Sequence, residues 1–433
     1  MNQAPDAETP LARTLLALTL PAALVGVVCA LLLWGAEELA ALLEHLWWGA
    51  LPDALGVGEA RWWPLVILTI TGALIGLVVE RAPGHAGYDS AQIELNAPPL
   101  PLRSLPGVAI VLVLALAGGV SLGPESPIIA LGVGVTVWGA RRFLPAVPVQ
   151  LAMVTAFAGI IAAMFSGPFA AALLLTEALA AAKGPGGLWD RMFLPMVSAV
   201  AASITARLLG MPSLIGDLGP ADVTLASTGW AVLIAAAAAA FGVAATYLLP
   251  LAHRAFRRLR RPLLYTTAGG LVLGVLGTIG GEITMFKGSA ATAQIISEAD
   301  TIALGSLVGI LVIKTAALVV SAAAGFRGGR IFPAIFIGTA TGVLGHAILP
   351  DVSIGLAVGA GVLGTVLAVS KSGWMALFGG VIIVGDATVI SALIAVLLPI
   401  WLLLARVPEM IVHAPGQLDS PPEEAAAVTP ERG

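Results

Sequence analysis

The sequence predicts an all-α integral membrane protein built from two related halves. Three observations predict this fold class: an apolar composition with few charges, long apolar runs that recur along the chain, and short motifs that repeat at one constant spacing. Hydrophobic residues make up 58% of the 433 residues, and charged residues make up only 11%. Because soluble domains average about 25% charged residues, this composition is typical of membrane proteins.

Five apolar runs are each near the roughly 20 residues that a membrane-spanning helix needs. They cover residues 15–33, 63–79, 230–251, 301–324 and 387–405. The first run is longer than a signal-peptide core and continues past any plausible cleavage point, so we expect a retained helix. Two shorter runs, residues 169–182 and 374–384, are bounded by Gly, Pro or Ser and are too short to cross alone. Such interrupted segments suggest helices that stop part-way through the membrane.

Charge and cysteine content narrow the class of protein. The formal net charge is −4 and no basic face carries interleaved aromatic residues, so we expect no nucleic-acid partner. A basic cluster from His253 to Arg261 directly follows an apolar run, and by the positive-inside tendency that end should face the cytoplasm. The opposite end, around Asp217 and Asp222, lacks Lys and Arg. The lone Cys29 excludes an intramolecular disulfide, and we interpret it as a small apolar core residue.

The two halves are visible as an internal repeat. Residues 123–132 read Gly-Pro-Glu-Ser-Pro-Ile-Ile-Ala-Leu-Gly, and residues 329–338 read Gly-Arg-Ile-Phe-Pro-Ala-Ile-Phe-Ile-Gly. Gly, Pro, Ile and Gly coincide at positions 1, 5, 7 and 10, with an offset of 329 − 123 = 206. The same offset places Ser166-Gly167 on Ser372-Gly373 and Gly119 on Gly325. Many transport proteins place their substrate site at the interface of such repeats, near the middle of the membrane.

This repeat predicts the organisation of the chain. We expect an N-terminal tail at residues 1–10, a first membrane repeat at 11–210, a linker at 211–225, a second membrane repeat at 226–405, and a C-terminal segment with a disordered tail at 406–433. The residues after 414 are rich in Pro, Glu and Ala and show no apolar periodicity, which is typical of disorder.

Each repeated motif predicts the start of a helix. Gly-rich backbone comes first, then Pro127 or Pro333 in the first helical turn, and then an uninterrupted apolar run. If these starts lie inside the membrane, their free N–H groups have no water to bond. A helix N-terminus offers about half a positive charge together with these donors, so two converging starts would bind a weakly hydrated anion.

Glu125 lies in the first motif. A charge at mid-membrane costs about 2.5–3.5 kcal/mol on insertion scales, so an intramembrane carboxylate is a functional hypothesis by default. The Glu125 carboxylate could occupy the anion site, compete with a bound anion and leave when protonated, which would make it a gate. The alternative is a simple helix N-cap.

Three further polar residues each leave two interpretations open. Arg327 and Arg330 flank the second motif, where they either raise the local anion concentration at a pore mouth or snorkel and pair at the membrane surface. Glu177 follows Ser166-Gly167-Pro168 on an apolar run and is either a proton-relay carboxylate or a satisfied helix-end residue. Lys371 flanks the corresponding segment of the second half, as does Asp386, and we expect both at the membrane interface.

These motifs resemble the CLC family of chloride channels and chloride/proton antiporters, over residues from about 10 to 405. The stretch Gly123-Pro124-Glu125-Ser126-Pro127 is similar to the family's G-(K/R)-E-G-P motif, which implies Glu125 as the gating glutamate and Gly123, Pro124 and Ser126 around the anion. The stretch Gly329-Arg330-Ile331-Phe332-Pro333 is similar to its G-x-F-x-P motif, whose second and third residues bind the anion through backbone amides. The resemblance therefore implies an anion site that also includes Arg330, Ile331 and Phe332.

The same resemblance implies an inverted-repeat helical bundle that forms a homodimer with one pore per subunit. Ser166-Gly167-Pro168 is similar to the N-A-P stretch that leads the dimer-interface helix. The family's G-S-G-I-P motif should fall near residues 83–90, where His85, Ser90 or backbone amides alone could replace its Ser. The pore Tyr has no counterpart among Tyr88, Tyr247 and Tyr265.

We therefore expect transmembrane transport of small monovalent anions, most of all chloride, through a channel-like pore gated by Glu125. The alternative is a proton-coupled chloride or fluoride antiporter with Glu177 as a proton relay. Ala178 stands where antiporters carry a second glutamate, which argues against classical proton coupling. We expect no cofactor, no metal and no enzymatic activity, because the five His residues are scattered singly. The expected location is a bacterial cytoplasmic membrane, with the lipid bilayer, anions and protons as partners.

Overall fold

The computed structural model describes residues 9–58, 60–92, 98–180, 187–212, 218–219, 221 and 223–412, and these residues are largely helical. The first half contains α1 (Thr9–His45), α2 (Leu51–Ala54), α3 (Trp63–Arg81), α4 (Leu105–Ala117), α5 (Glu125–Phe143), α6 (Val149–Met164), α7 (Pro168–Ala180) and α8 (Leu188–Leu208). The second half contains α9 (Leu225–Arg257), α10 (Pro262–Gly280), α11 (Ser289–Ser297), α12 (Leu304–Ala323), α13 (Ile331–Ile348), α14 (Ile354–Ser370), α15 (Gly373–Val384) and α16 (Ile390–Leu403). The prediction of an all-α membrane fold is confirmed for this part of the chain.

Six helical segments among the described residues are long and apolar enough to cross a membrane. They are Ala12–Ala54, Trp63–Arg81, Leu225–Arg257, Pro262–Gly280, Leu304–Ala323 and Ile331–Ile348. The described part of the short run at 169–182 forms α7, of 13 residues, and the run at 374–384 forms α15, of 12 residues, as predicted.

The prediction of a full-length helix at 387–405 was wrong. The Asp386 side chain accepts the N–H of Thr388 at 2.8 Å, and residues Ala387–Val389 form a 3₁₀ turn. The α-helix therefore begins only at Ile390 and has 14 residues, with Pro399 inside it. A hydropathy pattern does not register this local cap, because the cap depends on a side-chain hydrogen bond.

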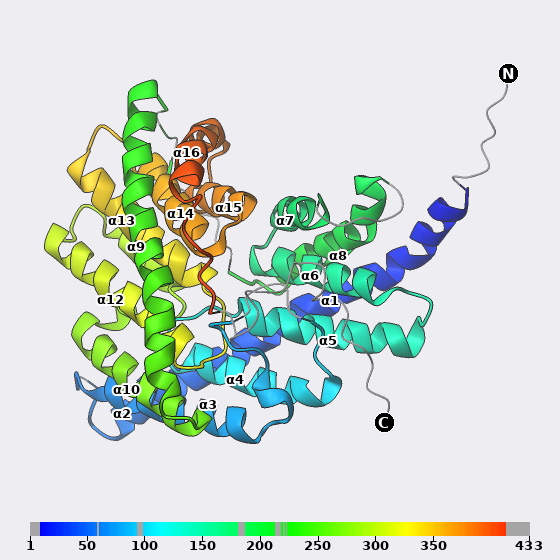
Figure 1. The fold of residues 1–433 in the computed structure, drawn as a ribbon, viewed down its shortest axis with the longest axis horizontal. Helices are drawn as coiled ribbons and strands as arrows, with labels where there is room; N and C mark the ends of the chain where they lie inside the picture. The colour runs from blue at the N-terminus through cyan, green and yellow to red at the C-terminus, as the bar shows by residue number, and fades with distance from the viewer. Residues whose placement is uncertain are drawn as a thin grey trace.

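The helix bounds follow the spacing seen in the sequence. The first residues of α5 and α13 are separated by 331 − 125 = 206 positions, and those of α6 and α14 by 354 − 149 = 205. Gly119 and Gly325 both have positive φ angles, 83° and 80°. Figure 1 shows the first-half helices α5 to α8 gathered on one side of the molecule and the second-half helices on the other. The helix starts in the two halves of the sequence therefore keep the spacing of the repeated motifs.

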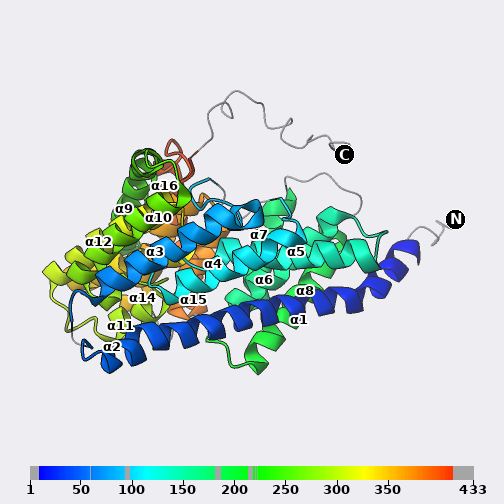
Figure 2. The same cartoon turned by 90° about the horizontal axis from the view of Figure 1, so that it is seen from below.

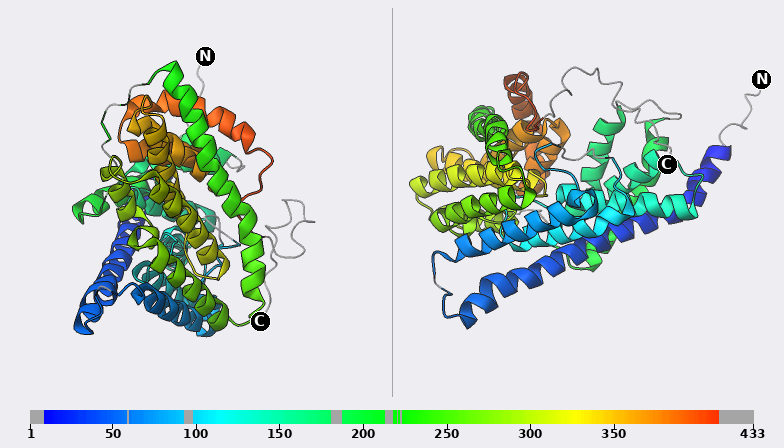
Figure 3. Two further views of the ribbon diagram at one scale, coloured as in Figure 1. Left: turned by 90° about the vertical axis from the view of Figure 1, so that its left-hand side faces the viewer. Right: turned by 60° about the horizontal axis from the view of Figure 1, so that its bottom comes forward.

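Helices α3 and α10 join the two halves along their length, as Figures 1 and 2 show. Small residues permit this close crossing. A Cβ at Gly72 would collide with the backbone oxygen of Thr266, and a Cβ at Gly270 would collide with that of Leu68. Glycine at such crossings lets membrane helices approach backbone to backbone. Figure 3 shows α1 running along the outside of this assembly.

The segment after α16 returns to the first half. Met410 is fully buried, and the N–H of Val412 donates to the carbonyl oxygen of Ala91 at 2.7 Å. Lys371, at the end of α14, donates from Nζ to the carbonyl of Leu404 at 3.0 Å. Asp217, Asp222 and the predicted disordered tail lie outside the described residues.

Candidate functional site

The two repeated motifs meet in the structure. The N–H of Gly123 donates to the carbonyl of Gly329, and the N–H of Gly329 donates to the carbonyl of Gly123, both at 2.8 Å. These two residues are the pair that the 206-residue offset equates. The starts of α5 and α13 therefore face each other across an antiparallel bridge.

Glu125 is the first residue of α5, and its side chain reaches the other helix start. It is 1% exposed, and its Oε1 accepts the N–H of Phe332 at 2.9 Å. Phe332 lies in the first turn of α13, where free N–H groups and the positive end of the helix dipole stabilise a carboxylate. The Glu125 carboxylate thus caps α13, a helix of the opposite half.

Glycine on both sides makes room for this carboxylate. A Cβ at Gly123 would overlap Oε2, Cδ and Oε1 of Glu125, all at the far end of the side chain. A Cβ at Gly329 would overlap Oε2 and Cδ and would also press on Cβ of Glu125. With the Glu125 side chain in this position, only glycine fits at residues 123 and 329.

Aromatic rings border the start of α13. The rings of Phe332 and Phe165 stack in parallel with centroids 6.1 Å apart, and Phe165 meets Phe378 edge-on at 5.3 Å. These rings come from the start of α13, the end of α6 and the middle of α15. Such an apolar wall strengthens the electrostatic interaction between a helix end and an anionic group.

The remaining predicted anion-site residues lie around the same point. Arg330 and Ile331 are each 1% exposed and Phe332 is 6% exposed, while Pro124 is buried and Ser126 is half-buried. The burial of Arg330 excludes a snorkelling side chain at a water-exposed surface. Arg327, at 6% exposed, is excluded from that position too.

Arg327 belongs to a buried charge network centred on Asp89. Its Nη1 lies 3.8 Å from Oδ1 of Asp89, and its Nη2 donates to the carbonyl of His85 at 3.2 Å. Arg257 pairs with Oδ2 of Asp89, and Nε2 of His253 lies 3.7 Å from the same oxygen. The basic end of α9 is thereby tied to the segment that precedes α13.

The electrostatics of this network favour the charged form of Asp89. Burial alone would raise the pKa of Asp89, but hydrogen bonding with His253 and the charges of Arg327 and Arg257 outweigh it and hold the pKa below its usual value. Asp89 was not among the site residues predicted from the sequence. Its one available signal was a carboxylate within residues 83–90, the segment with no clear counterpart in the family motif.

Ser90 and His85 were the candidates to replace the family's pore Ser, and they have different surroundings. Ser90 Oγ lies 2.7 Å from the carbonyl of Phe326 and 2.9 Å from that of Gly328, and it accepts the N–H of Gly328 at 2.8 Å. His85 Nδ1 lies 3.2 Å from the carbonyl of Val79, at the end of α3. Ser90 is thus the candidate whose side chain contacts the backbone beside the second motif.

Glu177 has a different environment from Glu125. Its side chain is exposed, and its Oε2 accepts the hydroxyl of Ser372 at 2.6 Å. Ser372 also caps α15 by accepting the N–H of Met375. Glu177 therefore contributes to the contact between α7 and α15.

Comparison with known proteins decides the family. A family model described as "Voltage gated chloride channel" matches residues 67–402. The chain belongs to this family, the CLC family. Its CLC relatives include the "Putative ion-transport protein YfeO" of Escherichia coli (strain K12 / DH10B) and of Shigella boydii serotype 4 (strain Sb227). Each is 40% identical over 420 residues, covering 96% of this chain and 99% of the relative.

Solved CLC structures share the fold. A slow cyanobacterial Cl⁻/H⁺ antiporter matches with a TM-score of 0.77 and 19% identity, over 90% of this chain and 96% of that one. A CLC-type fluoride/proton antiporter matches with a TM-score of 0.67 and 18% identity, over 91% and 98%. A eukaryotic CLC transporter matches with a TM-score of 0.72 and 16% identity, over 92% and 73%.

Because the chain belongs to the CLC family, its general function is anion transport. The family is one of channels and transporters rather than enzymes. The six apolar helices and the bacterial CLC relatives identify an integral protein of the bacterial inner membrane, as predicted.

Proposed function

We propose that this protein passes small monovalent anions, chloride foremost, between the starts of α5 and α13, with Glu125 as the gate. The observation that carries the proposal is the hydrogen bond from the N–H of Phe332 to the Glu125 carboxylate at 2.9 Å. A carboxylate and a halide need the same donors and the same positive helix end. A seated Glu125 therefore competes with an anion for one position.

The gate operates through the charge of Glu125. In the seated state the carboxylate engages the N–H of Phe332 and an anion is displaced. Protonation removes the negative charge and weakens the charge-assisted hydrogen bond, so the side chain leaves and an anion takes its place. The anion then binds the backbone amides of Arg330 and Ile331 and that of Phe332, while Gly123, Pro124 and Ser126 border it from the start of α5.

Two modes of transport use this gate. A channel-like mode is favoured by Ala178, because antiporters of the family carry a second glutamate at this position. A proton-coupled chloride or fluoride antiport mode is favoured by the solved structures with the same fold, two of which are described as anion/proton antiporters.

We also propose that residues 11–210 and 226–405 are the two membrane repeats, joined by the linker at 211–225, and that the protein is a homodimer. By the resemblance of Ser166-Gly167-Pro168, the dimer surface would include α7, which exposes the apolar side chain of Phe169.

The gating assignment is tested with purified protein in liposomes. Glu125→Gln keeps the shape of the side chain but removes its charge and titration. We expect anion efflux from this variant to lose the pH dependence of the wild type, because the gate no longer changes charge. Efflux with an unchanged pH dependence would show that Glu125 is not the gate.

The mode and the ion are tested in the same vesicles. Chloride and pH electrodes read simultaneously while a chloride gradient is imposed. Anion movement without proton movement supports the channel-like mode, whereas protons driven uphill support antiport. Replacing chloride with fluoride at equal concentration then compares the two rates.

A further inference from the structure

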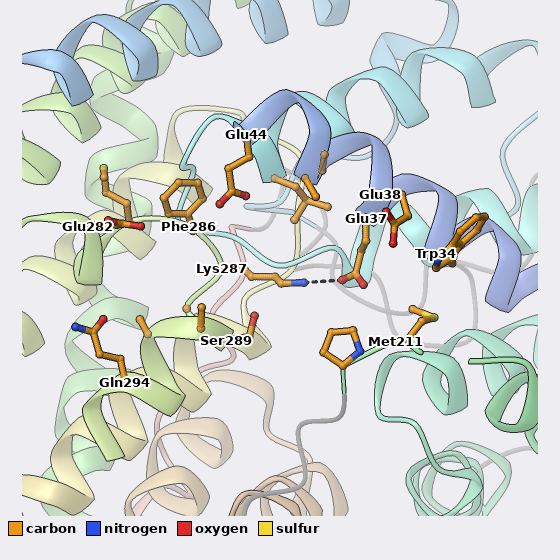
Figure 4. Close-up of a pocket in the computed structure, with 18 of the residues that line it drawn as sticks. Trp34, Glu37, Glu38, Glu44, Met211, Glu282, Phe286, Lys287, Ser289 and Gln294 are labelled. Atoms are coloured by element: carbon orange, nitrogen blue, oxygen red, sulfur yellow. Dashed lines mark hydrogen bonds and ion pairs between the residues drawn. The ribbon is translucent and has the colours of Figure 1, made fainter. Parts of the chain in front are cut away.

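An acidic cavity of about 380 Å³ lies beside the candidate site. Figure 4 shows Glu37, Glu38 and Glu44 pointing into it from α1, and Glu282 from the segment after α10. Lys287 is the single Lys or Arg among its described lining residues. The uncharged Ser289 and Gln294 of α11 complete its rim, together with residues 209–212 after α8.

The cavity opens at the end of the helices opposite to the basic cluster. Helix α10 begins at Pro262, directly after Arg261, and ends at Gly280, two residues before Glu282 of the cavity. Because positively charged loops favour the cytoplasmic side, the cavity faces the other side of the membrane.

Lys287 joins this cavity to the Glu125 site. Its Nζ donates to Oε1 of Glu37 at 2.5 Å, as the dashed line in Figure 4 marks. The same Nζ lies 5.6 Å from the centroid of the Phe332 ring. The backbone N–H of Phe332 is the donor that holds Glu125, so one residue of α13 contacts both charged groups.

The position of Lys287 is set by the preceding backbone. Lys314, which is fully buried in α12, donates from Nζ to the carbonyls of Thr284, Met285 and Phe286 at 3.2, 2.8 and 2.8 Å. The N–H of Phe286 donates to the carbonyl of Gly119 at 3.0 Å. The segment before Lys287 is therefore held against the Gly-rich backbone of the first half.

We propose that Lys287 binds small monovalent anions at the outer mouth and that Glu37 competes with them for its ammonium group. This inference rests on the proposed function, because anions bound at Lys287 would go on to enter the path that Glu125 gates. Four carboxylates repel an arriving anion, and one ammonium group attracts it. An anion that replaces Glu37 on Lys287 arrives next to Phe332, at the start of α13.

The competition follows from the surroundings of the pair. The side chains of Lys287 and Glu37 are 24% and 23% exposed, so water screens them only in part. Glu38, Glu44 and Glu282 are the other titratable groups that face the pair, and they add a background negative field without bonding Lys287.

The experiment measures the half-saturating chloride concentration of flux into proteoliposomes at constant ionic strength, with gluconate replacing chloride. Lys287→Gln should raise this concentration about threefold to tenfold, and Lys287→Arg should keep it near the wild-type value. Glu37→Gln should lower it about twofold to fivefold, because Lys287 loses its competitor. In a Lys287→Gln background, Glu37→Gln should have little further effect.

Glu38→Gln is the matched control, since it removes the same charge from the same cavity wall without touching Lys287. Equal effects of Glu37→Gln and Glu38→Gln would show that only the net charge of the cavity matters and not the ion pair between Glu37 and Lys287. That outcome would overturn the proposal. An unchanged half-saturating concentration in Lys287→Gln, with size-exclusion behaviour like the wild type, would also overturn it while leaving the proposed function intact. A wild-type protein without any anion flux would instead refute the proposed function.

Discussion

Gly123→Ala tests the position that the Glu125 carboxylate occupies at the start of α13 and leaves Glu125 itself unchanged. The added Cβ would overlap only the terminal atoms of the Glu125 side chain, which can swing away at little cost to the fold. The backbone hydrogen bonds of residue 123 with Gly329 remain available to alanine. We therefore expect Gly123→Ala to displace the Glu125 carboxylate from the start of α13 while the helices stay in place.

The size of the effect follows from the interaction that is lost. A hydrogen bond to a charged group contributes about 1.5–3 kcal/mol. Losing this contribution for the seated state shifts the ratio of displaced to seated Glu125 by roughly 10-fold to 150-fold, since about 1.4 kcal/mol corresponds to a factor of ten. At neutral pH, where the seated state limits flux, the variant should carry anions about tenfold faster or more.

The assay is chloride efflux from proteoliposomes between pH 4 and 8, about the range in which a carboxyl gate titrates. Gly139→Ala is the control, because it lies on the same helix and its Cβ would meet nothing within 4 Å. It should behave as the wild type. Flux through Gly123→Ala that matches Gly139→Ala in rate and pH dependence would refute the idea that the Glu125 carboxylate blocks the anion position.

Three further predictions concern other described residues. Asp89→Asn should reduce stability by about 3–5 kcal/mol, because Arg327 and Arg257 lose their carboxylate partner, and thermal unfolding in detergent measures this. The folded pKa of Asp89 lies below its ordinary value of 3.8, so the stability that its carboxylate contributes is complete above pH 3.8. This stability is lost as the pH falls through the folded pKa. An Asp89→Asn variant that melts like the wild type would contradict the predicted loss of stability. Lys314→Met should cost about 3 kcal/mol or more by leaving three buried carbonyls without their donor, and hydrogen exchange of residues 284–287 should rise. Glu177→Gln should leave anion flux and proton movement unchanged, and a loss of proton movement on the pH electrode would restore Glu177 as a relay.

Local pattern was sufficient to predict the helix starts and the pairing of the two halves. A Gly-rich stretch followed by proline and then by an apolar run is typical of a helix start. Helices α5 and α13 begin where these motifs predict. The small apolar Cys29 was also predicted correctly and is fully buried. These features depend on neighbours in the sequence or on a comparison of the sequence with itself.

Long-range charge pairing could not be predicted from one sequence. Asp89 and Arg257 are 168 residues apart, and Glu37 and Lys287 are 250 residues apart. Lys314 looks like an isolated charge in an apolar run, and its three carbonyl partners are visible only once the segment after α10 is positioned. Each of these contacts depends on how helices cross, and neither hydropathy nor spacing encodes the crossing.

The bridge between Gly123 and Gly329 also bears on the origin of polarity in this protein. Two equivalent residues that bond each other lie next to the two-fold axis that relates the halves. An ancestor with two identical halves would have presented the same chemistry to both sides of the membrane. The 206-residue offset places Ile331 opposite Glu125, so only one copy carries an acid. Two acids at that axis would have repelled each other. Glu125 therefore gives equivalent positions of the two halves different chemistry.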